Sequence, residues 1–305
     1  MRAPANPLEF WFKAGRTPFL TAPLLSVVLA AAFHRFMGGT IAWGLWWLTL
    51  VGVGFVNLGI NLVNDYYDHR QGSDNLNQRR TMFNGGSGFI QAGWASPLQI
   101  RNAGWLCLGV AALIGLYLVT RTGPVLWWVI AAGFVLSVGY SAPPLSLGST
   151  GWGELIAGLS CGPLVALGTY WVLGGSEPAL MALVAVPLGL LVSAILVINE
   201  VPDEPADAQV GKRTLVVRWG SAAGIRLHQV LIGGAYASVI LLVLLSLLPL
   251  SSLAVLLTLP VALKTLRHAA AGVGSDPVEA FTGAMAGTVG LHVLVSVVVA
   301  ASILR

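Results

Sequence analysis

The feature that most constrains this chain is a series of nine long apolar runs, separated by short polar segments. A lipid-exposed helix satisfies its backbone hydrogen bonds internally, and about 20 apolar residues carry it across a bilayer. Only 9% of the 305 residues are charged, too few to cover a water-facing surface. We therefore predict an all-α integral membrane protein, a bundle of about nine transmembrane helices. The runs lie at roughly Pro18–Phe36, Ile41–Val63, Pro97–Val119, Val125–Tyr140, Trp152–Val172, Ala179–Ile198, Ala222–Leu247, Leu253–Leu266 and Val278–Leu304.

The basic residues are distributed unequally between the two sides of this predicted bundle. With nine spans, thirteen of the sixteen Lys and Arg residues fall on the side of the N-terminus, and only Arg35, Arg121 and Arg305 fall opposite. Basic residues are retained on the cytoplasmic side of a membrane. We therefore expect a multi-pass protein of the cell's inner, cytoplasmic membrane, with the N-terminus in the cytoplasm and the C-terminus outside.

The acidic residues gather on the same predicted side. Seven of the twelve lie at the cytoplasmic ends of the second and sixth runs or just beyond: Asp65, Asp68, Asp74, Glu200, Asp203, Glu204 and Asp207. Two acid clusters on one membrane face can converge. We expect one active site there, facing the cytoplasm.

The first cluster continues the second run, from Asn61 to Asp74. If the helix continues, residues spaced i, i+3, i+4 and i+7 share one of its faces, and these are Asn61, Asn64, Asp65 and Asp68. The spacing therefore predicts a polar helix face at the membrane surface.

The second cluster follows the sixth run, from Asn199 onward. Asn199, Asp203 and Asp207 are spaced four apart and would also share a helix face. We expect Pro202 and Pro205 to kink or loosen this helix, because proline cannot donate a helical hydrogen bond.

The two clusters align as copies of each other. Asn64, Asp65 and Asp68 correspond to Asn199, Glu200 and Asp203, four spans further along the chain. An even number of spans gives both copies the same orientation, which predicts two parallel-oriented four-helix repeats. The halves are about 18–142 and 150–268, followed by a last helix at 278–304, all within one membrane domain over residues 1–305.

Carboxylates packed along one helix face repel each other, and a divalent cation relieves that repulsion. Mg²⁺ prefers oxygen ligands and is typically bound by one or two carboxylates together with substrate phosphates. Two facing clusters therefore predict two Mg²⁺ ions with a diphosphate between them. The expected catalytic and metal-binding carboxylates are Asp65, Asp68, Asp203 and Asp207, with Asn64 and Asn199 as further ligands. Arg70, Lys212 and Arg213 lie beside the acids and are expected to neutralise the remaining phosphate charge.

These residues resemble the motifs of the UbiA superfamily of intramembrane prenyltransferases. Its members carry an N-D-x-x-D motif with a further Asp downstream, here Asn64, Asp65, Asp68 and Asp74, and a D-x-x-x-D motif, here Asp203 and Asp207. The likeness covers nearly the whole chain. Residues 61–74, 84–91 and 211–218 are most similar to the 1,4-dihydroxy-2-naphthoate polyprenyltransferase branch of menaquinone biosynthesis.

The resemblance implies transfer of a polyprenyl group from polyprenyl diphosphate to an aromatic acceptor, with Mg²⁺ as cofactor, in a lipid bilayer and without a nucleic-acid partner. The apolar tail would lie in a groove between spans. Tyr140 opens a loop similar to the superfamily's Tyr-led loop, but Ser146 stands where a basic residue is common, so acceptor recognition departs from the pattern. The predicted substrate-binding residues are Asn61, Asn64, Arg70, Asp74, Tyr140, Asn199, Lys212 and Arg213.

Several alternatives remain open at this stage. The same superfamily includes enzymes with other aromatic acceptors and terpene cyclases that need no acceptor. A transporter would place its acids near the middle of the membrane, and none of the twelve lies there. Acidic residues that are simply solvated at the membrane surface would explain a single cluster. They explain two matched clusters less well. Glu154, which opens the fifth run, fits an acceptor pocket and a helix-dipole role equally well.

Overall fold

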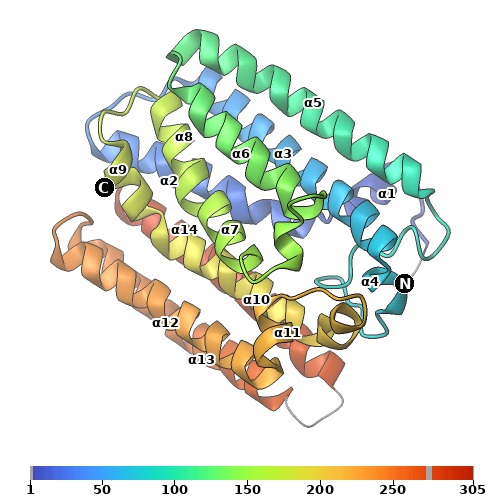
Figure 1. The fold of residues 1–305 in the computed structure, drawn as a ribbon. Coiled ribbons are helices and arrows are strands. Elements are labelled where there is room, and N and C mark those ends of the chain that lie inside the picture. Colours follow the sequence, from blue (N-terminus) through green and yellow to red (C-terminus); the bar gives the residue numbers. More distant parts are fainter. Residues whose placement is uncertain (1–2, 273–276, 305) are drawn as a thin grey trace.

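The computed structural model of this chain describes residues 3–272 and 277–304, where every regular element is helical (Figure 1). The α-helices are α1 (Pro7–Ala14), α2 (Thr21–Phe36), α3 (Trp43–Gln71), α4 (Ser73–Leu76), α5 (Pro97–Thr122), α6 (Leu126–Ser141), α7 (Gly153–Leu159), α8 (Val165–Val172), α9 (Pro178–Val184), α10 (Val186–Gln209), α11 (Leu215–Trp219), α12 (Ser221–Leu244), α13 (Leu259–Ala271) and α14 (Pro277–Ser302). Short 3-10 helices, η1 (Thr17–Leu20), η2 (Leu147–Ser149) and η4 (Leu250–Thr258), and one π-helical turn, η3 (Ser160–Leu164), join or extend them. Arg305, which enters the predicted charge asymmetry, lies outside the described residues.

Eight helical stretches among the described residues are long and apolar enough to cross a membrane, and α6 is a shorter apolar helix. The eight are Thr17–Phe36, Trp43–Gln71, Pro97–Thr122, Gly153–Val172, Val186–Gln209, Ser221–Leu244, Leu250–Ala271 and Phe281–Ser302. The prediction of an all-helical, multi-pass membrane bundle is confirmed. Helix α3 continues past the predicted end at Val63 to Gln71, so the first acid cluster is helical.

Helix α10 differs from the sequence prediction. We expected Pro202 and Pro205 to kink or loosen it, but the helix is continuous to Gln209 with both prolines inside. Each proline removes a backbone hydrogen bond, and the surrounding helices hold α10 in place. In its most apolar stretch 78% of the residues are buried, against 56% or less in the other spans. The second cluster therefore keeps its helical spacing.

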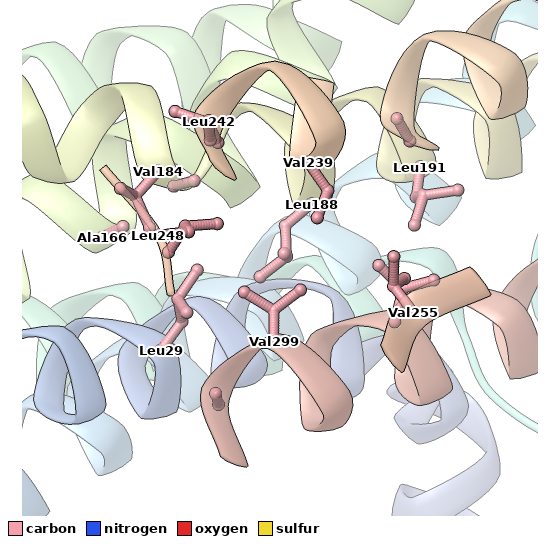
Figure 2. Packing of buried hydrophobic residues seen from close by; sticks show 14 of the residues in the cluster. Leu29, Ala166, Val184, Leu188, Leu191, Val239, Leu242, Leu248, Val255 and Val299 are labelled. Atoms are coloured by element: carbon pink, nitrogen blue, oxygen red, sulfur yellow. The ribbon is translucent and has the colours of Figure 1, made fainter. Parts of the chain in front are cut away.

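The centre of the bundle is a hydrophobic core around α10 (Figure 2). Leu188 and Leu191 of α10 belong to one buried cluster with Leu29 of α2, Val239 of α12 and Val299 of α14. Lipid tails are as apolar as these side chains, so close packing rather than exclusion of water holds the helices together. The core fixes α10 relative to its neighbours, and with it the second acid cluster.

Glycines allow both acid-bearing helices to approach a neighbour closely. A Cβ on Gly158 of α7 would lie 2.7 Å from the carbonyl oxygen of Gly189 of α10, and a Cβ on Gly189 would lie 2.8 Å from the carbonyl oxygen of Gly158. On α3 and α5, a Cβ on Gly59 or Gly104 would lie 3.0 Å from the other residue's carbonyl oxygen. Larger side chains would push these helices apart, as is common for small residues in membrane bundles.

The carboxyl ends of α3 and α10 lie at the same end of the bundle, close to the short helices α4 and α11 (Figure 1). The segments that follow them, residues 72–96 and 210–220, form a polar cap over this end. All the predicted site residues except Tyr140 therefore come from these two helices and the cap.

Candidate active site

The two acid clusters line one cavity of about 90 Å³ at this end of the bundle. Helix α3 contributes Asn64 and Asp68, and α10 contributes Asn199, Asp203 and Asp207. Because both helices keep their periodicity through the polar residues, side chains that share a helix face point into the same space. Further lining residues predicted from sequence are Asp74, Tyr140 and Lys212.

Lys212 joins the two clusters. Its Nζ lies 2.9 Å from Oδ1 of Asp68 and 3.3 Å from Oδ1 of Asp207, one carboxylate from each acid-bearing helix. Burial acts to lower the pKa of the Lys212 ammonium, but the two carboxylates outweigh it and raise that pKa above its ordinary value. Lys212 therefore places a stable positive charge between the clusters.

Asp203 is held by the loop that follows α4. Its Oδ1 accepts hydrogen bonds from Nδ2 of Asn77 and Nδ2 of Asn84, each at 2.5 Å. Its Oδ2 accepts a third, from the backbone N–H of Gly85 at 3.2 Å. Hydrogen bonds to a charged group are the stronger ones, so they tie the loop to α10. Sequence reasoning missed both asparagines: Asn84 heads a recognisable stretch, 84–91, whereas nothing in the sequence marks Asn77.

Asp65 is buried beneath the glycine-rich part of the same loop. Its Oδ2 accepts a hydrogen bond from the backbone N–H of Ser87 at 3.0 Å, while its Oδ1 has no hydrogen-bond partner. Gly86 has a φ of +68°, and a Cβ there would collide with Oδ2 of Asp74 and lie 3.1 Å from Oδ1 of Asp65. Only glycine lets the backbone lie so close to both carboxylates.

Asp74 lines the cavity from α4 and is almost fully buried. Burial raises the pKa of its carboxyl to about 8, and the neighbouring Asp68 and Asp65 carboxylates act in the same direction. Arg80 braces the loop by donating to the backbone carbonyl of Asp74 at 2.6 Å and to that of Gly85 at 2.5 Å. A bound cation would stabilise acidic groups that are as crowded and buried as these.

Arg16 is a cationic residue of the site that sequence reasoning missed. It lies between α1 and η1 in a left-handed conformation, with φ of +53°. Its Nη1 lies 3.4 Å from Oδ1 of Asn64 and 3.7 Å from Oδ1 of Asp65, and the residue lines the cavity. In the sequence it is indistinguishable from a basic residue that sets orientation, because its contact with α3 is made through the fold.

Three predicted substrate-binding residues do not line the cavity. Asn61 donates its side-chain N–H to the backbone carbonyl of Gly15 at 3.1 Å. Arg70 is exposed and donates to the hydroxyl of Tyr66 at 3.3 Å, on a different side of α3 from Asp68. Arg213 is exposed at the start of the turn before α11. These residues are near the acids in sequence, but helical phase decides which side chains face the cavity.

The oxygen donors that line the cavity, together with Asp65 buried just behind the lining, fit Mg²⁺. Oδ1 of Asp65 and Oδ1 of Asn199 are buried oxygens without a hydrogen-bond partner, and both belong to hard ligands of the kind Mg²⁺ prefers. Among residues 3–272 and 281–304, whose side chains the structure describes, no three His, Cys, Asp or Glu side chains are close enough to hold a metal ion by themselves. The arrangement therefore suits an ion shared between one or two carboxylates and the phosphates of a substrate.

An apolar groove of about 610 Å³ lies beside the cavity, between α3, α5, α6 and α8. On α3 its lining ends at Ile60, one helical turn before Asn64 of the cavity, and on α6 at Ser137, one turn before Ser141 of the cavity. Residues four apart are neighbours on a helix, so the linings of the groove and the cavity come within one helical turn of each other on both helices. Leu113, a strongly exposed wall residue, lies where the groove reaches the lipid-facing surface.

A multi-pass helical bundle with a buried, acid-lined cavity one helical turn from an apolar groove has the features of an intramembrane enzyme. The chain belongs to the UbiA prenyltransferase family, whose sequence pattern matches residues 22–300. It is accordingly a membrane prenyltransferase, as the two Asp motifs indicated.

Curated relatives and a solved structure agree with this assignment. The 1,4-dihydroxy-2-naphthoate octaprenyltransferase of Mycobacterium tuberculosis is 32% identical over 207 residues, 65% of this chain and 68% of that protein. The protein of the same name from Escherichia coli is 27% identical over 264 residues, 83% of this chain and 85% of that protein. A UbiA homologue from Archaeoglobus fulgidus, solved with DMAPP and Mg²⁺, matches with a TM-score of 0.61 at 15% identity, over 95% of this chain and 99% of that chain. The last likeness shows the shared fold.

Proposed function

We propose that this enzyme transfers a polyprenyl group from polyprenyl diphosphate to 1,4-dihydroxy-2-naphthoate, the prenylation step of menaquinone biosynthesis. The observation that carries the proposal is that a polar, acid-lined cavity lies one helical turn from an apolar groove. An amphiphilic diphosphate matches such an arrangement, with its head in the cavity and its tail in the groove. The relatives named for this acceptor support the choice of the naphthoate.

We infer that Asp65, Asp68, Asp203 and Asp207, with Asn64 and Asn199, hold two Mg²⁺ ions. The unpartnered oxygens of Asp65 and Asn199 support this assignment. Mg²⁺ bound there supplies Lewis-acid stabilisation of the diphosphate.

The chain's own residues have separate tasks in the proposed reaction. Lys212 and Arg16 bind phosphate oxygens and stabilise the negative charge that grows as the C1–O bond breaks and its electron pair leaves with the diphosphate. Tyr140, in the cavity wall on α6, shields the allylic cation left at C1. A ring carbon of the acceptor that carries hydrogen then forms the new bond to C1 and loses its proton, which restores the aromatic ring. The neighbouring carboxylate leaves as CO₂, and a proton takes its place on the ring, so no proton is lost overall.

The test is turnover by the purified protein with geranylgeranyl diphosphate and Mg²⁺, with and without the naphthoate, followed by mass spectrometry of the products. We expect a prenylated, decarboxylated naphthalenediol only when the acceptor is present. The variant Asp68→Asn, which removes one carboxylate of the cavity without changing its size, is the inactive control. No prenylated product from the wild-type protein would contradict the proposal.

A second candidate has one specific observation in its favour. Ser146 occupies the place where a basic residue is common in the Tyr-led loop of the family, so this loop lacks the usual cation. This fits another aromatic acceptor or a terpene cyclase. Diphosphate release without acceptor, accompanied by a cyclic hydrocarbon, would identify the cyclase.

A further inference from the structure

Two carboxyl groups outside the predicted metal set meet on the α7–α10 side of the cavity. The carboxyls of Glu154, in the first turn of α7, and Glu200, in α10, lie close enough to interact electrostatically. Their side chains are buried, at 2% and 7% exposure, and Oε2 of each has no hydrogen-bond partner. Glu200 also lines the cavity. A buried acceptor atom without a donor is costly, so this pair is suited to a ligand.

Glu154 is fixed in place from two directions. Its Oε1 accepts a hydrogen bond from the backbone N–H of Leu215 at 2.7 Å, and its backbone carbonyl accepts one from Oγ of Ser193 at 2.8 Å. One turn further along α7, Gly158 makes the close contact with Gly189 of α10. Glu154 is therefore held against Glu200 by the backbone packing of the two helices.

The depth of Glu200 matches the place where the acceptor has to bind. Glu200 precedes Asp203 by three residues on one helix face, which puts it about 4.5 Å deeper into the bundle. The C1 atom of a bound prenyl diphosphate has to lie just deeper than its diphosphate, where the cavity approaches the groove. The groove runs along α3, α5, α6, η3 and α8, and none of its lining residues comes from α10, which carries Glu200. An acceptor ring placed against C1 has to approach from the side away from the groove wall on α3 and α5. Glu200 lies on that side, so the ring reaches it.

The chemistry of this wall selects a hydrogen-bond donor. The unpartnered oxygens of this wall accept a hydrogen bond. A phenolic hydroxyl supplies one, whereas an ionised carboxylate has no proton to donate. The loop on the other side of the cavity offers no cation at Ser146 for an acceptor carboxylate. Both features disfavour recognition through a carboxylate and favour recognition through a hydroxyl.

We propose that Glu200 binds a ring hydroxyl of the aromatic acceptor, with Glu154 as the positioning residue behind it. The enzyme then recognises a hydroxyaromatic compound by its hydroxyl rather than by its carboxylate. This inference rests on the proposed prenyl transfer and adds the group by which the acceptor is selected. The competing role for Glu200 is metal binding, because it aligns with Asp65 in the other cluster.

The first test separates these roles by kinetics. In Glu200→Met, which has a similar length but no oxygen to accept the bond, we expect the KM for the naphthoate to rise about tenfold or more, the cost of leaving the acceptor's hydroxyl without its hydrogen bond. The KM for prenyl diphosphate and the Mg²⁺ concentration for half-maximal rate should stay unchanged. Glu154→Gln keeps a carbonyl for the Leu215 N–H and should give a smaller rise in the same constant. Glu177→Gln, an exposed glutamate before α9, is the matched control. A higher Mg²⁺ requirement with an unchanged acceptor KM would overturn the proposal.

The second test uses the wild-type protein and needs no variant to fold. We expect 1,4-dihydroxynaphthalene, kept reduced under nitrogen, to compete with the naphthoate at similar concentrations, and 2-naphthoate, which has no hydroxyl, to compete at least about tenfold more weakly. Equal competition by 2-naphthoate would overturn the inference alone. Absence of any prenylated naphthoate from the wild-type enzyme would instead overturn the proposed function.

Discussion

At the scale of single residues, the carboxylates of the cavity have different partners, and substitutions should separate their effects. Asp68 is bonded to Lys212, whereas Asp203 also holds the covering loop through Asn77 and Asn84. Asp68 therefore acts on the substrate side of the cavity, whereas Asp203 also holds the loop that follows α4.

We predict that Asp68→Asn and Asp203→Asn both lower turnover by about 10²-fold or more, the usual cost of removing one group that stabilises developing charge. Only Asp203→Asn should also loosen the loop, because an amide cannot accept all three hydrogen bonds that Asp203 accepts. Arg79 is exposed in that loop, so limited trypsin digestion in detergent reports loosening. Faster cleavage at Arg79 in Asp203→Asn but not in Asp68→Asn is expected. Equal cleavage of both variants would show that Asp203 does not anchor the loop.

Asp74 predicts a pH dependence of stability. Burial raises the pKa of its carboxyl from 3.8 to about 8. Between these values the folded state binds the proton and the unfolded state does not, so stability falls as pH rises from about 4 to about 8. In the metal-free protein, Asp74→Asn should therefore flatten the fall of the thermal unfolding midpoint across this window. The midpoint measured in detergent with EDTA checks this. A slope identical to the wild type would place the Asp74 carboxyl in a more polar setting.

At the scale of elements, the relative position of α7 and α10 depends on two glycines. A Cβ on Gly189 would lie 2.8 Å from the carbonyl oxygen of Gly158, a backbone atom that cannot rotate away. The same contact holds Glu154 near Glu200, so helix packing and the shape of the cavity are linked.

We predict that Gly189→Ala destabilises the protein by about 1–3 kcal/mol, the usual cost of overpacking. It should also raise the KM for the acceptor, because α7 has to move away from α10. Gly233→Ala on α12 is the control, since a Cβ there meets nothing within 4 Å, and alanine in an open helix position is neutral or stabilising. Measuring the thermal unfolding midpoint and the KM for the acceptor in both variants tests this prediction. A Gly189→Ala protein as stable as Gly233→Ala would contradict the close contact.

How much of these elements the sequence predicts depends on what defines each boundary. The apolar runs identify the spans, because the membrane demands them, but they miss the extension of α3 to Gln71, which lies in polar sequence. Spacing correctly groups Asp203 with Asp207 on one face of α10, because helical phase is local. The donors to Asp203 and the contact of Arg16 with Asp65 are not predictable this way, because they depend on how a loop folds back across the bundle. We keep the two four-helix repeats, about 18–142 and 150–268, as a proposal.

At the scale of the whole molecule, the short helix α6 decides the topology. It has 16 residues, about 24 Å at 1.5 Å per residue, against a hydrocarbon core of about 30 Å. The contacts of Lys212 with Asp68 and Asp207 require the ends of α3 and α10 to lie on one side. An even number of membrane crossings must therefore separate these two ends. The helices α5, α6, α7–α8 and α10 supply four, so α6 has to cross. A helix this short is accommodated by local thinning of the bilayer.

We therefore predict that α6 spans the membrane and that the polar cap lies in the cytoplasm, in keeping with the bias of basic residues. Single cysteines at Arg121, Leu145 and Trp219, all exposed, test this after Cys107 and Cys161 are replaced by alanine. A membrane-impermeant maleimide applied to intact cells should label Arg121→Cys only, and cell lysis should expose Leu145→Cys and Trp219→Cys together. If α6 did not cross, Leu145→Cys would label with Arg121→Cys from outside. The loop that opens after Tyr140 would then be separated from the acids by the bilayer, and one cavity could not contain both.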